Sequence, residues 1–289
     1  MRLTAAAACA LLAACAARTP APPAPTQATA VQPTAAMEAN RRAEASLRRG
    51  ELDGAAFHYR EALRLSLAVE DAEGIAANAV NLSIVHQRQG KTEEARASLA
   101  PLLERATLRH APVHRAQAAL RRAVLDLDER RHASAAEWAA RATDWCGTPC
   151  ALAGPIRNVQ GQLALAAGRL EEAAAAAANA LAESRAAGQA AEIANAHRLR
   201  GMTALAAGDG AAALAALGEA LAIDRELGIP RRIFLDLVGL GGASKLQGDR
   251  QAARGYYARA QAVSEADRDA AGSAEARALL DELDLASRK

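Results

Sequence analysis

Aromatic side chains are scarce in this sequence. Two Trp, three Tyr and two Phe make up 2% of its 289 residues. β-Sheets are enriched in aromatic and β-branched residues, and proteins that bind RNA or single-stranded DNA stack bases on aromatic rings. A large excess of one charge is also missing, because 35 Lys and Arg face 33 Asp and Glu. We therefore expect neither an all-β fold nor a nucleic-acid partner.

Recognisable catalytic motifs are missing as well. We find no serine-nucleophile motif, no phosphate-binding glycine loop and no pair of carboxylates in a familiar catalytic frame. His110 and His114 have the spacing of a helical metal site, but Pro112 between them indicates a turn, and no third ligand is near. We expect no enzymatic activity, no cofactor and no metal site.

Alanine is the residue that the chain has in abundance. The sequence contains 83 alanines and is 51% hydrophobic. Alanine is the strongest helix former, and its small side chain lets helices approach closely. The length alone is typical of one or two domains with a sizeable core. The composition therefore predicts an all-α protein of closely packed helices.

The first residues have the pattern of a secretory signal. Met1-Arg2 is a short basic start, and the apolar run Leu3–Ala14 is twelve residues long, too short to span a bilayer. The run ends in Leu12-Ala13-Ala14-Cys15, which resembles the lipobox of bacterial lipoproteins. The resemblance implies cleavage before Cys15 and acylation of that residue, with residues 1–14 as the signal peptide. The alternative is an ordinary signal, cut near Cys15, that releases a soluble periplasmic protein.

A proline-rich segment follows the signal. Residues 18–36 contain five of the ten prolines among Ala, Thr and Gln, with no apolar periodicity. Such a segment forms an extended tether of roughly 3 Å per residue. We expect residues 15–36 to be this tether, lipidated at Cys15. Because Ala16 follows the cysteine where Asp would imply inner-membrane retention, the lipobox resemblance implies an outer-membrane anchor with the folded part facing the periplasm.

The rest of the chain is organised by an internal repeat. Gly50 is followed by Ala five residues later, then by Tyr59 and Ala62, and the frame of glycine and alanine recurs along the chain. Its markers are at positions 50, 90, 130, 168, 208 and 248, so the steps are 40, 40, 38, 40 and 40 residues. A fixed period of this size predicts a solenoid.

Each repeat is expected to be a helix–turn–helix unit. Apolar residues at helical spacing precede each marker, and a glycine at that point supplies the left-handed residue that ends a helix. Asp53, Thr92 and Asp249 are candidate N-caps of the second helices. Small residues are predicted to let the paired helices approach. These are Ser83, Gly161, Gly201 and Gly241 in the first helices and Ala95, Ala173, Ala213 and Ala253 in the second.

This pattern resembles the tetratricopeptide repeat (TPR), over six units from about Ala36 to Ala262. The period exceeds the usual repeat of about thirty-four residues and resembles the lengthened variant of some partner-binding scaffolds. Three departures alter the expected local shape. The third repeat has Arg130 in place of its glycine and carries Arg122 and Asp126 at usually apolar positions, while Pro101 is predicted to kink a helix.

The predicted boundaries place the solenoid at residues 37–272 and a capping helix at 273–289. Ala276, Leu279, Leu280 and Leu283 share one face of that last helix and would cover the open end of the stack.

In an oxidising compartment, Cys146 and Cys150 are expected to form a structural disulfide. A redox role is the alternative, although three intervening residues do not match the two-residue redox motif.

The TPR resemblance implies where a partner would bind. In that family the first helix of each repeat lines an inner groove, which suits a peptide segment with aliphatic anchors. We expect Arg198 or Lys245 to meet an acidic group of that segment. The alternative is that the aliphatic residues only pack against neighbouring helices. The predicted groove residues are Val80, Ile84, Gln87, Leu120, Val124, Leu127, Asn158, Gln162, Leu165, Asn195, Arg198, Met202, Val238 and Lys245.

The implied function is that of a non-catalytic adaptor. Lipoproteins with this repeat act as assembly factors or scaffolds in the bacterial envelope, so the expected partner is an envelope protein or one of its peptide segments. One alternative is a structural subunit of a secretion or pilus machine, which would use its convex faces. A third possibility, an accessory protein with a small-molecule site, has no motif to support it.

Overall fold

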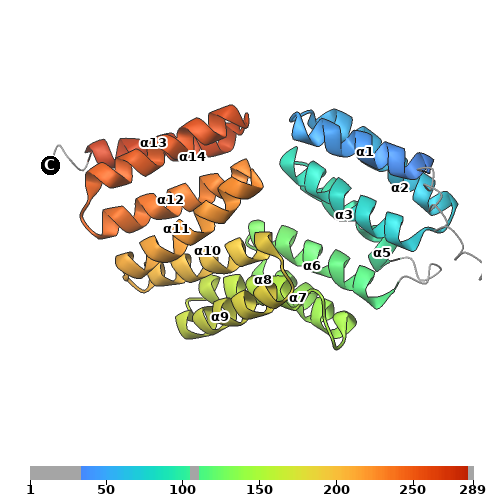
Figure 1. The fold of residues 1–289 in the computed structure, drawn as a ribbon, viewed down its shortest axis with the longest axis horizontal. Coiled ribbons are helices and arrows are strands. Elements are labelled where there is room, and N and C mark those ends of the chain that lie inside the picture. The colour runs from blue at the N-terminus through green and yellow to red at the C-terminus, as the bar shows by residue number, and fades with distance from the viewer. Residues whose placement is uncertain (1–33, 105–110, 286–289) are drawn as a thin grey trace, which may run out of the picture. The chain divides into compact units, whose positions relative to one another are not determined.

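The computed structural model describes residues 34–104 and 111–285, and in these residues all regular structure is helical (Figure 1). They belong to one compact unit, Pro33–Lys289. The all-α prediction is confirmed. The helices are α1 (Ala35–Arg48), α2 (Leu52–Ala68), α3 (Ala72–Arg88), α4 (Thr92–Ala97), α5 (Ala100–Leu103), α6 (Pro112–Asp128), α7 (His132–Cys146), α8 (Ala153–Ala166), α9 (Leu170–Ala186), α10 (Ala190–Ala206), α11 (Gly210–Leu227), α12 (Pro230–Leu246), α13 (Arg250–Ala266) and α14 (Ala270–Leu285).

The helices pack in consecutive pairs that form two layers. Apart from the short helices α4 and α5, each helix packs on the next along the chain, and α1, α3, α6, α8, α10 and α12 also contact one another in succession. The second helices of the pairs lack comparable contacts with each other within the described residues. A stack curves toward the layer whose members are closer together, so the first helices form the inner layer. This arrangement confirms the predicted solenoid of helix–turn–helix repeats.

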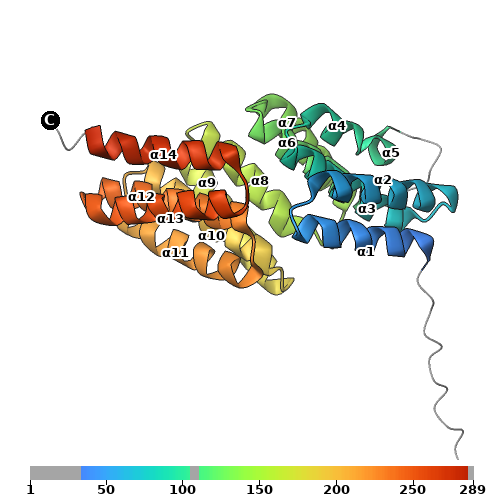
Figure 2. The ribbon, with the colours of Figure 1, turned by 90° about the horizontal axis from the view of Figure 1, so that it is seen from above.

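An ion pair shows how far the stack curves. Arg88 ends α3, and Asp267 lies in the turn after α13, 179 residues later in the chain. The Arg88 guanidinium is 3.4 Å from the Asp267 carboxylate. In Figure 2 the ends of the C-terminal helices face those of the N-terminal helices. The inner layer therefore encloses a concave face.

The turns repeat at half of the predicted period. Residues with positive φ occur every twenty positions over much of the chain, and Glu70, Arg130 and Arg268 adopt this conformation as the glycines do. The amide after the left-handed residue donates to the carbonyl five residues earlier, both at Gly50 (Glu51 to Ser46) and at Arg130 (Arg131 to Asp126). This is the bond of a Schellman motif. The third repeat therefore keeps its turn without glycine.

Small residues lie where the paired helices are closest. A Cβ atom added to Gly241 would be 2.2 Å from Cε1 of Tyr257, and one added to Gly201 would be 2.5 Å from Cγ of Leu217. Ala95, Ala173, Ala213 and Ala253 are fully buried, as is Ser83. The predicted role of these small residues is confirmed.

The N-caps were predicted less well. The Asp249 side chain accepts a hydrogen bond from the Ala252 amide, as expected. Asp53 and Thr92 are not caps, because α2 and α4 begin one or two residues earlier than the apolar pattern indicated. Their N-cap residues, Glu51 and Lys91, make no capping side-chain bond.

Pro101 divides the second helix of repeat two. The helix stops after Ala97 and resumes as the short α5, in which Pro101 occupies the first turn. Proline lacks an amide hydrogen and clashes with the preceding turn of a continuous helix. The predicted kink is therefore a complete break.

The charged residues of the third repeat form a buried network. The Asp126 carboxylate is fully buried and accepts hydrogen bonds from Arg96 (3.1 Å), Arg131 (2.5 Å) and Ser134 (2.6 Å), while Arg122 lies 3.4 Å from it. Arg96 is only 5% exposed. Buried charge is tolerated when it is paired and hydrogen-bonded. The polar residues that departed from the repeat pattern thus hold α4, α6 and α7 together.

The ends of the folded unit differ slightly from the predicted boundaries. α1 begins at Ala35, inside the segment expected to be tether, and α14 begins at Ala270 rather than at 273. α14 packs on α13 and buries Ala276 and Leu283, as expected of a terminal cap. The signal peptide at 1–14, Cys15 and the tether up to residue 33 lie outside the described residues.

Candidate functional site

The concave face contains a cavity of about 530 Å³. This volume is in the range of about 300–1,000 Å³ that is typical of ligand pockets. Its walls come from the inner helices α3, α6, α8 and α10. The lining residues are Glu73, Ala76, Ala77, Val80, Asn81, His114, Gln117, Leu120, Arg121, Val124, Leu152, Pro155 and Glu192.

Three predicted groove residues line this cavity. Val80, Leu120 and Val124 are half-buried, and each also packs on a core cluster behind it. Their aliphatic side chains form part of the cavity wall while supporting the helix contacts. These three residues therefore pack against neighbouring helices, as the alternative interpretation expected, and their exposed parts face the cavity.

The cavity lies about one helical turn nearer the N-terminal ends of the inner helices than predicted. His114 and Gln117 precede Leu120, Pro155 precedes Asn158, and Glu192 precedes Asn195 at spacings of three to six residues. Residues three or four positions apart share a helix face. Adding the residues three to six positions before each predicted groove residue would have identified these cavity residues.

A chain of hydrogen bonds runs along the inner face from α8 to α12. The buried Asn158 donates to the Glu192 carboxylate at 3.0 Å, and Asn195 donates to the same oxygen at 3.1 Å. Arg198 donates to the side-chain oxygen of Asn195 at 2.7 Å and to Asp236 at 2.7 Å. The predicted residues Asn158, Asn195 and Arg198 are thus brought together, and they are joined through a carboxylate that the sequence analysis missed.

Arg198 does not supply the free positive charge that was expected in the groove. Its guanidinium binds both Asp236 on α12 and Asp224 on α11, and both of these carboxylates are fully buried. Arg232 lies 3.9 Å from Asp224 and adds a second positive charge. Burial raises the pKa of Asp236 to about 6, and the Arg198 charge opposes that rise. Because two internal carboxylates occupy Arg198, it is not a free cation for an acidic partner.

Gln87 is part of a second polar group, between α3 and α6. Arg121 donates to the Gln87 side-chain oxygen at 2.5 Å and to the Ser83 hydroxyl at 3.1 Å, and Gln87 donates to Asp128. Burial lowers the pKa of Arg121 to about 10. The guanidinium is therefore directed at its own neighbours, although its side chain contributes to the cavity wall.

The remaining predicted residues do not line this cavity. Lys245 is 2.5 Å from Glu282 of the capping helix, so its charge is also paired internally. Val238 packs beside the C-terminal core cluster, while Met202 and Gln162 are exposed. The others outside the cavity are Ile84, Leu127 and Leu165, all half-buried.

A smaller cavity of about 250 Å³ adjoins the first. It lies between α1 and α3, and its lining includes Met37, Asn40, Arg41 and Asp71. Ala77 lines both cavities, so they adjoin each other at α3. Within the smaller cavity, Asn40 of α1 donates to the Asn78 side chain of α3 at 2.7 Å.

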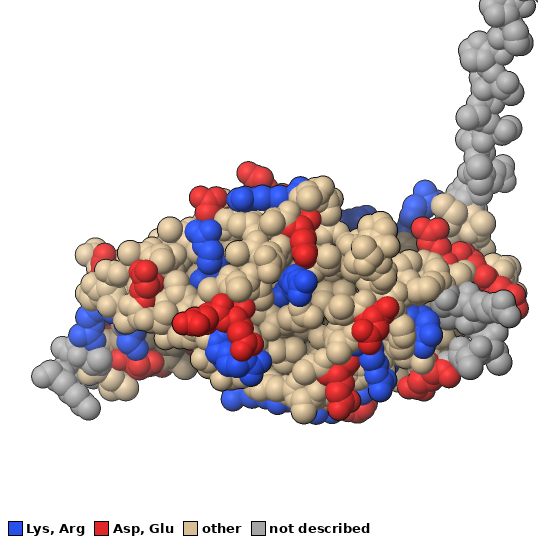
Figure 3. All heavy atoms as spheres, turned by 90° about the horizontal axis from the view of Figure 1, so that it is seen from below, with Lys and Arg blue, Asp and Glu red and all other residues tan. Residues whose placement is uncertain are grey.

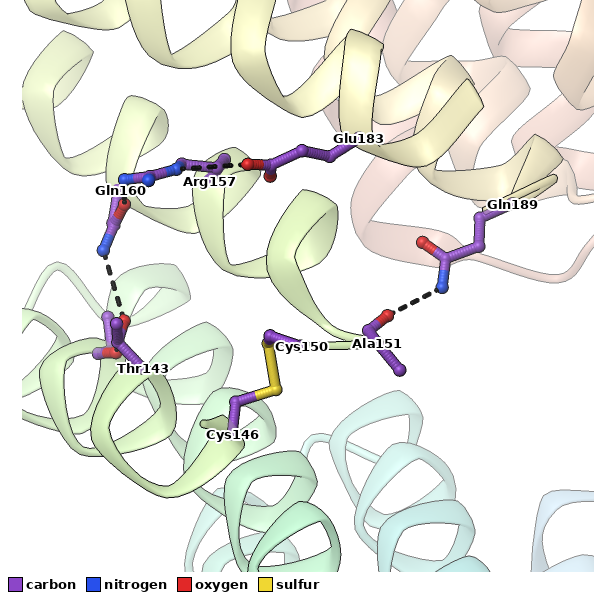
Figure 4. Close-up of a disulfide and its surroundings, with 9 residues drawn as sticks. Thr143, Cys146, Cys150, Ala151, Arg157, Gln160, Glu183 and Gln189 are labelled. Carbon is purple, nitrogen blue, oxygen red and sulfur yellow. Dashed lines mark hydrogen bonds and ion pairs between the residues drawn. A yellow bond between two sulfur atoms is a disulfide. The ribbon is translucent and has the colours of Figure 1, made fainter. Parts of the chain in front are cut away.

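The disulfide lies in the turn between α7 and α8 (Figure 4). Cys146 ends α7 and is bonded to Cys150, with 5.2 Å between their Cα atoms. Gln189 donates to the Ala151 carbonyl at 3.0 Å, and so connects this turn to the start of α10. The predicted cysteine pairing is present, and it closes part of the turn of residues 147–152 that leads into α8.

The charges on the outer surface are interspersed. On the face shown in Figure 3, lysines and arginines lie beside aspartates and glutamates with uncharged surface between them. No helix of the described residues is long and apolar enough to cross a membrane, and the same residues contain no cluster of three or more His, Cys, Asp or Glu that could hold a metal.

Comparisons with known proteins identify the fold alone. No protein-family model matches the chain, and no curated protein matches it. The chain is similar to the crystal structure of BtubC (BKLC) from P. vanneervenii, with a TM-score of 0.50 and 20% sequence identity. The match covers 81% of this chain and 92% of that one. At this identity, the similarity supports the helical architecture and carries no functional assignment.

Proposed function

We propose that this chain is a non-catalytic protein-binding scaffold of the TPR type, held at the bacterial outer membrane by a lipid on Cys15 and facing the periplasm. The observation that carries the proposal is the cavity of about 530 Å³ on the concave face, with walls from four successive inner helices. Val80, Leu120 and Val124 give it aliphatic surface on which a client's side chains can pack. The client is an envelope protein or an extended segment of one.

Site-specific photo-crosslinking in intact cells tests this proposal. A photoreactive residue at Gln117 faces the cavity, and a matched one at Ala178 lies on the exposed outer side of α9. We expect a discrete covalent adduct from position 117 and none from position 178. Thermal melting of both variants controls for folding. The absence of an adduct at position 117 would contradict the scaffold.

A structural subunit of a larger machine is the second candidate. The outer face of α9 exposes Ala174, Ala175, Ala178 and Ala182, an uncharged surface of small side chains that could pack on a neighbouring subunit. This function predicts the opposite crosslinking result, with an adduct from Ala178 and none from Gln117. Size measurement of the native complex would then show a fixed number of copies of this chain in each complex.

The lipid anchor has a separate test. Replacing Cys15 by Ser removes the sulfur that would carry the diacylglycerol, and multiple acyl chains are what make such anchoring stable. We expect the C15S protein to move from the membrane fraction to the soluble fraction. Unchanged membrane recovery would contradict lipidation, whereas solubility of both forms would support the soluble periplasmic alternative.

A further inference from the structure

The charge that the cavity offers to a client is negative. Its lining contains two carboxylates, Glu73 and Glu192, together with one guanidinium, that of Arg121, and the imidazole of His114. Arg121 is already bound to Ser83 and Gln87 of α3, with the Asp128 carboxylate nearby. The two glutamates have no ion pair within the part of the chain that the structure describes, so their charges are uncompensated.

Glu192 is held in a defined orientation. Its Oε2 atom accepts from Asn158, which is 2% exposed, at 3.0 Å and from Asn195 at 3.1 Å. Although Glu192 is in the first turn of α10, no hydrogen bond joins its side chain to the free amides of that turn among the described contacts. Two neutral amides therefore fix the carboxylate, one from the neighbouring helix α8 and one from α10 itself, and neither brings a positive charge to it.

The apolar wall lies in the same cavity. Leu120 and Val124 of α6 and Leu152 before α8 line it together with the two glutamates. Lys and Arg side chains cover apolar surface with their methylene stems while their charged ends reach polar groups. An aliphatic wall beside an unpaired carboxylate is therefore complementary to such a side chain.

We propose that the cavity binds a client segment in which Lys or Arg lies beside an aliphatic residue. This inference rests on the proposed scaffold function and specifies the chemistry of its client. The aliphatic residue packs against Val80, Leu120 and Val124, and the basic side chain meets Glu192 or Glu73. An acidic segment is disfavoured, because like charges placed together in an interface repel each other.

Selection from a random peptide library tests the charge of the client. Short random peptides displayed on phage are selected on the full-length protein in detergent, and in parallel on a variant with Glu73→Gln and Glu192→Gln. Glutamine retains an oxygen that can accept from Asn158 and Asn195, so the network is preserved. The matched control is Glu171→Gln, which changes an exposed glutamate on the outer helix α9.

We expect the wild-type protein and the Glu171→Gln control to enrich Lys and Arg beside Leu, Ile or Val. The double variant is expected to lose the basic enrichment and keep the aliphatic one. A peptide recovered on wild type should bind the double variant about tenfold more weakly, which corresponds to about 1.4 kcal/mol. Raising the salt concentration should reduce this difference.

Three outcomes would overturn the inference: enrichment of acidic peptides, enrichment of no charge, or the same basic enrichment on the double variant. These outcomes are distinguishable from failure of the scaffold proposal. If Gln117 forms its adduct but the selected peptides have no basic preference, the scaffold stands and the client chemistry is wrong. If Gln117 forms no adduct and no peptide is enriched, both are wrong.

Discussion

Nε of Arg198 is 2.7 Å from Oδ1 of Asp236, and this bond joins α10 to α12 across the inner layer. The same guanidinium also binds Asp224 on α11, so one side chain connects three helices. Arg96 has a similar part in the N-terminal half, where it joins α4 to the buried Asp126 of α6. Two buried ionic networks thus cross-link an alanine-rich stack that has few large side chains to interlock.

Replacing Arg198 by Ala should destabilise the fold strongly. The change leaves the fully buried Asp224 and Asp236 without their main cation, and removing one partner of a buried pair costs about 3–5 kcal/mol. The control is Arg254→Ala, which breaks an ion pair whose side chains are 52% and 45% exposed. That pair should contribute less than about 1 kcal/mol. Urea unfolding measures both, and an R198A protein as stable as R254A would contradict the structural role.

The stability of the protein should depend on the ionisation of Asp236. Burial raises the pKa of this carboxyl from 3.8 to about 6, so the folded state binds its proton more tightly than the unfolded state. The stabilising contribution is complete below the lower value and is lost as the pH rises through about 6. Wild type should therefore lose stability relative to Asp236→Asn between these values. Urea midpoints of both proteins across this range give the comparison, and parallel curves would count against a raised pKa.

Two glycine substitutions should have opposite effects. In Gly241→Ala the new methyl group meets the Tyr257 ring at 2.2 Å, and overpacking costs about 1–3 kcal/mol. Gly255 on α13 has no neighbouring atom within 4 Å of the same position. Because Ala is the better helix former, Gly255→Ala should stabilise the protein by about 0.5–1 kcal/mol. Melting temperatures test the pair, and a stable G241A would show that the helices can separate at no cost.

Arg130→Gly should stabilise the third repeat. Arg130 has φ of 57°, a conformation that costs a non-glycine residue about 1–2 kcal/mol and costs glycine little. Part of this gain is offset by the greater freedom of glycine in the unfolded chain, so we expect a net increase of about 0.5 kcal/mol. Gly208→Ala, at a φ of 82°, should have the opposite sign. Chemical denaturation measures the stability of both variants. A change of the same sign in the two would contradict this prediction.

Loss of the disulfide should have a moderate effect. The two cysteines are four residues apart, and closing so short a loop stabilises a fold by about 2 kcal/mol in the chain-entropy account. Cys146→Ser with Cys150→Ser should therefore lower the melting temperature without abolishing folding. Thiol titration of the unreduced wild-type protein provides the control. Two free thiols at these positions would contradict the structural disulfide.

The repeat was predictable because its determinants are local. Glycine at the turns and small residues at the helix contacts recur in the sequence, so the pairing of helices follows from spacing alone. The half-period of twenty residues was hidden, because at the intermediate positions Glu70 and Arg268 adopt the left-handed conformation without a glycine to mark it. Tertiary packing can stabilise a backbone conformation that a residue's own preference opposes.

The sequence by itself determined the helical content, the period and the layer of helices that forms the inner face. Only the tertiary structure decided which charges remain available on that face. Arg198 and Lys245 appeared to be free cations, but Asp224, Asp236 and Glu282 come from other helices and neutralise them. Among the described residues, Glu192 is bound by neutral amides and has no ion pair. Ion pairing depends on distances between helices that are remote in sequence, and helical periodicity contains no information about those distances.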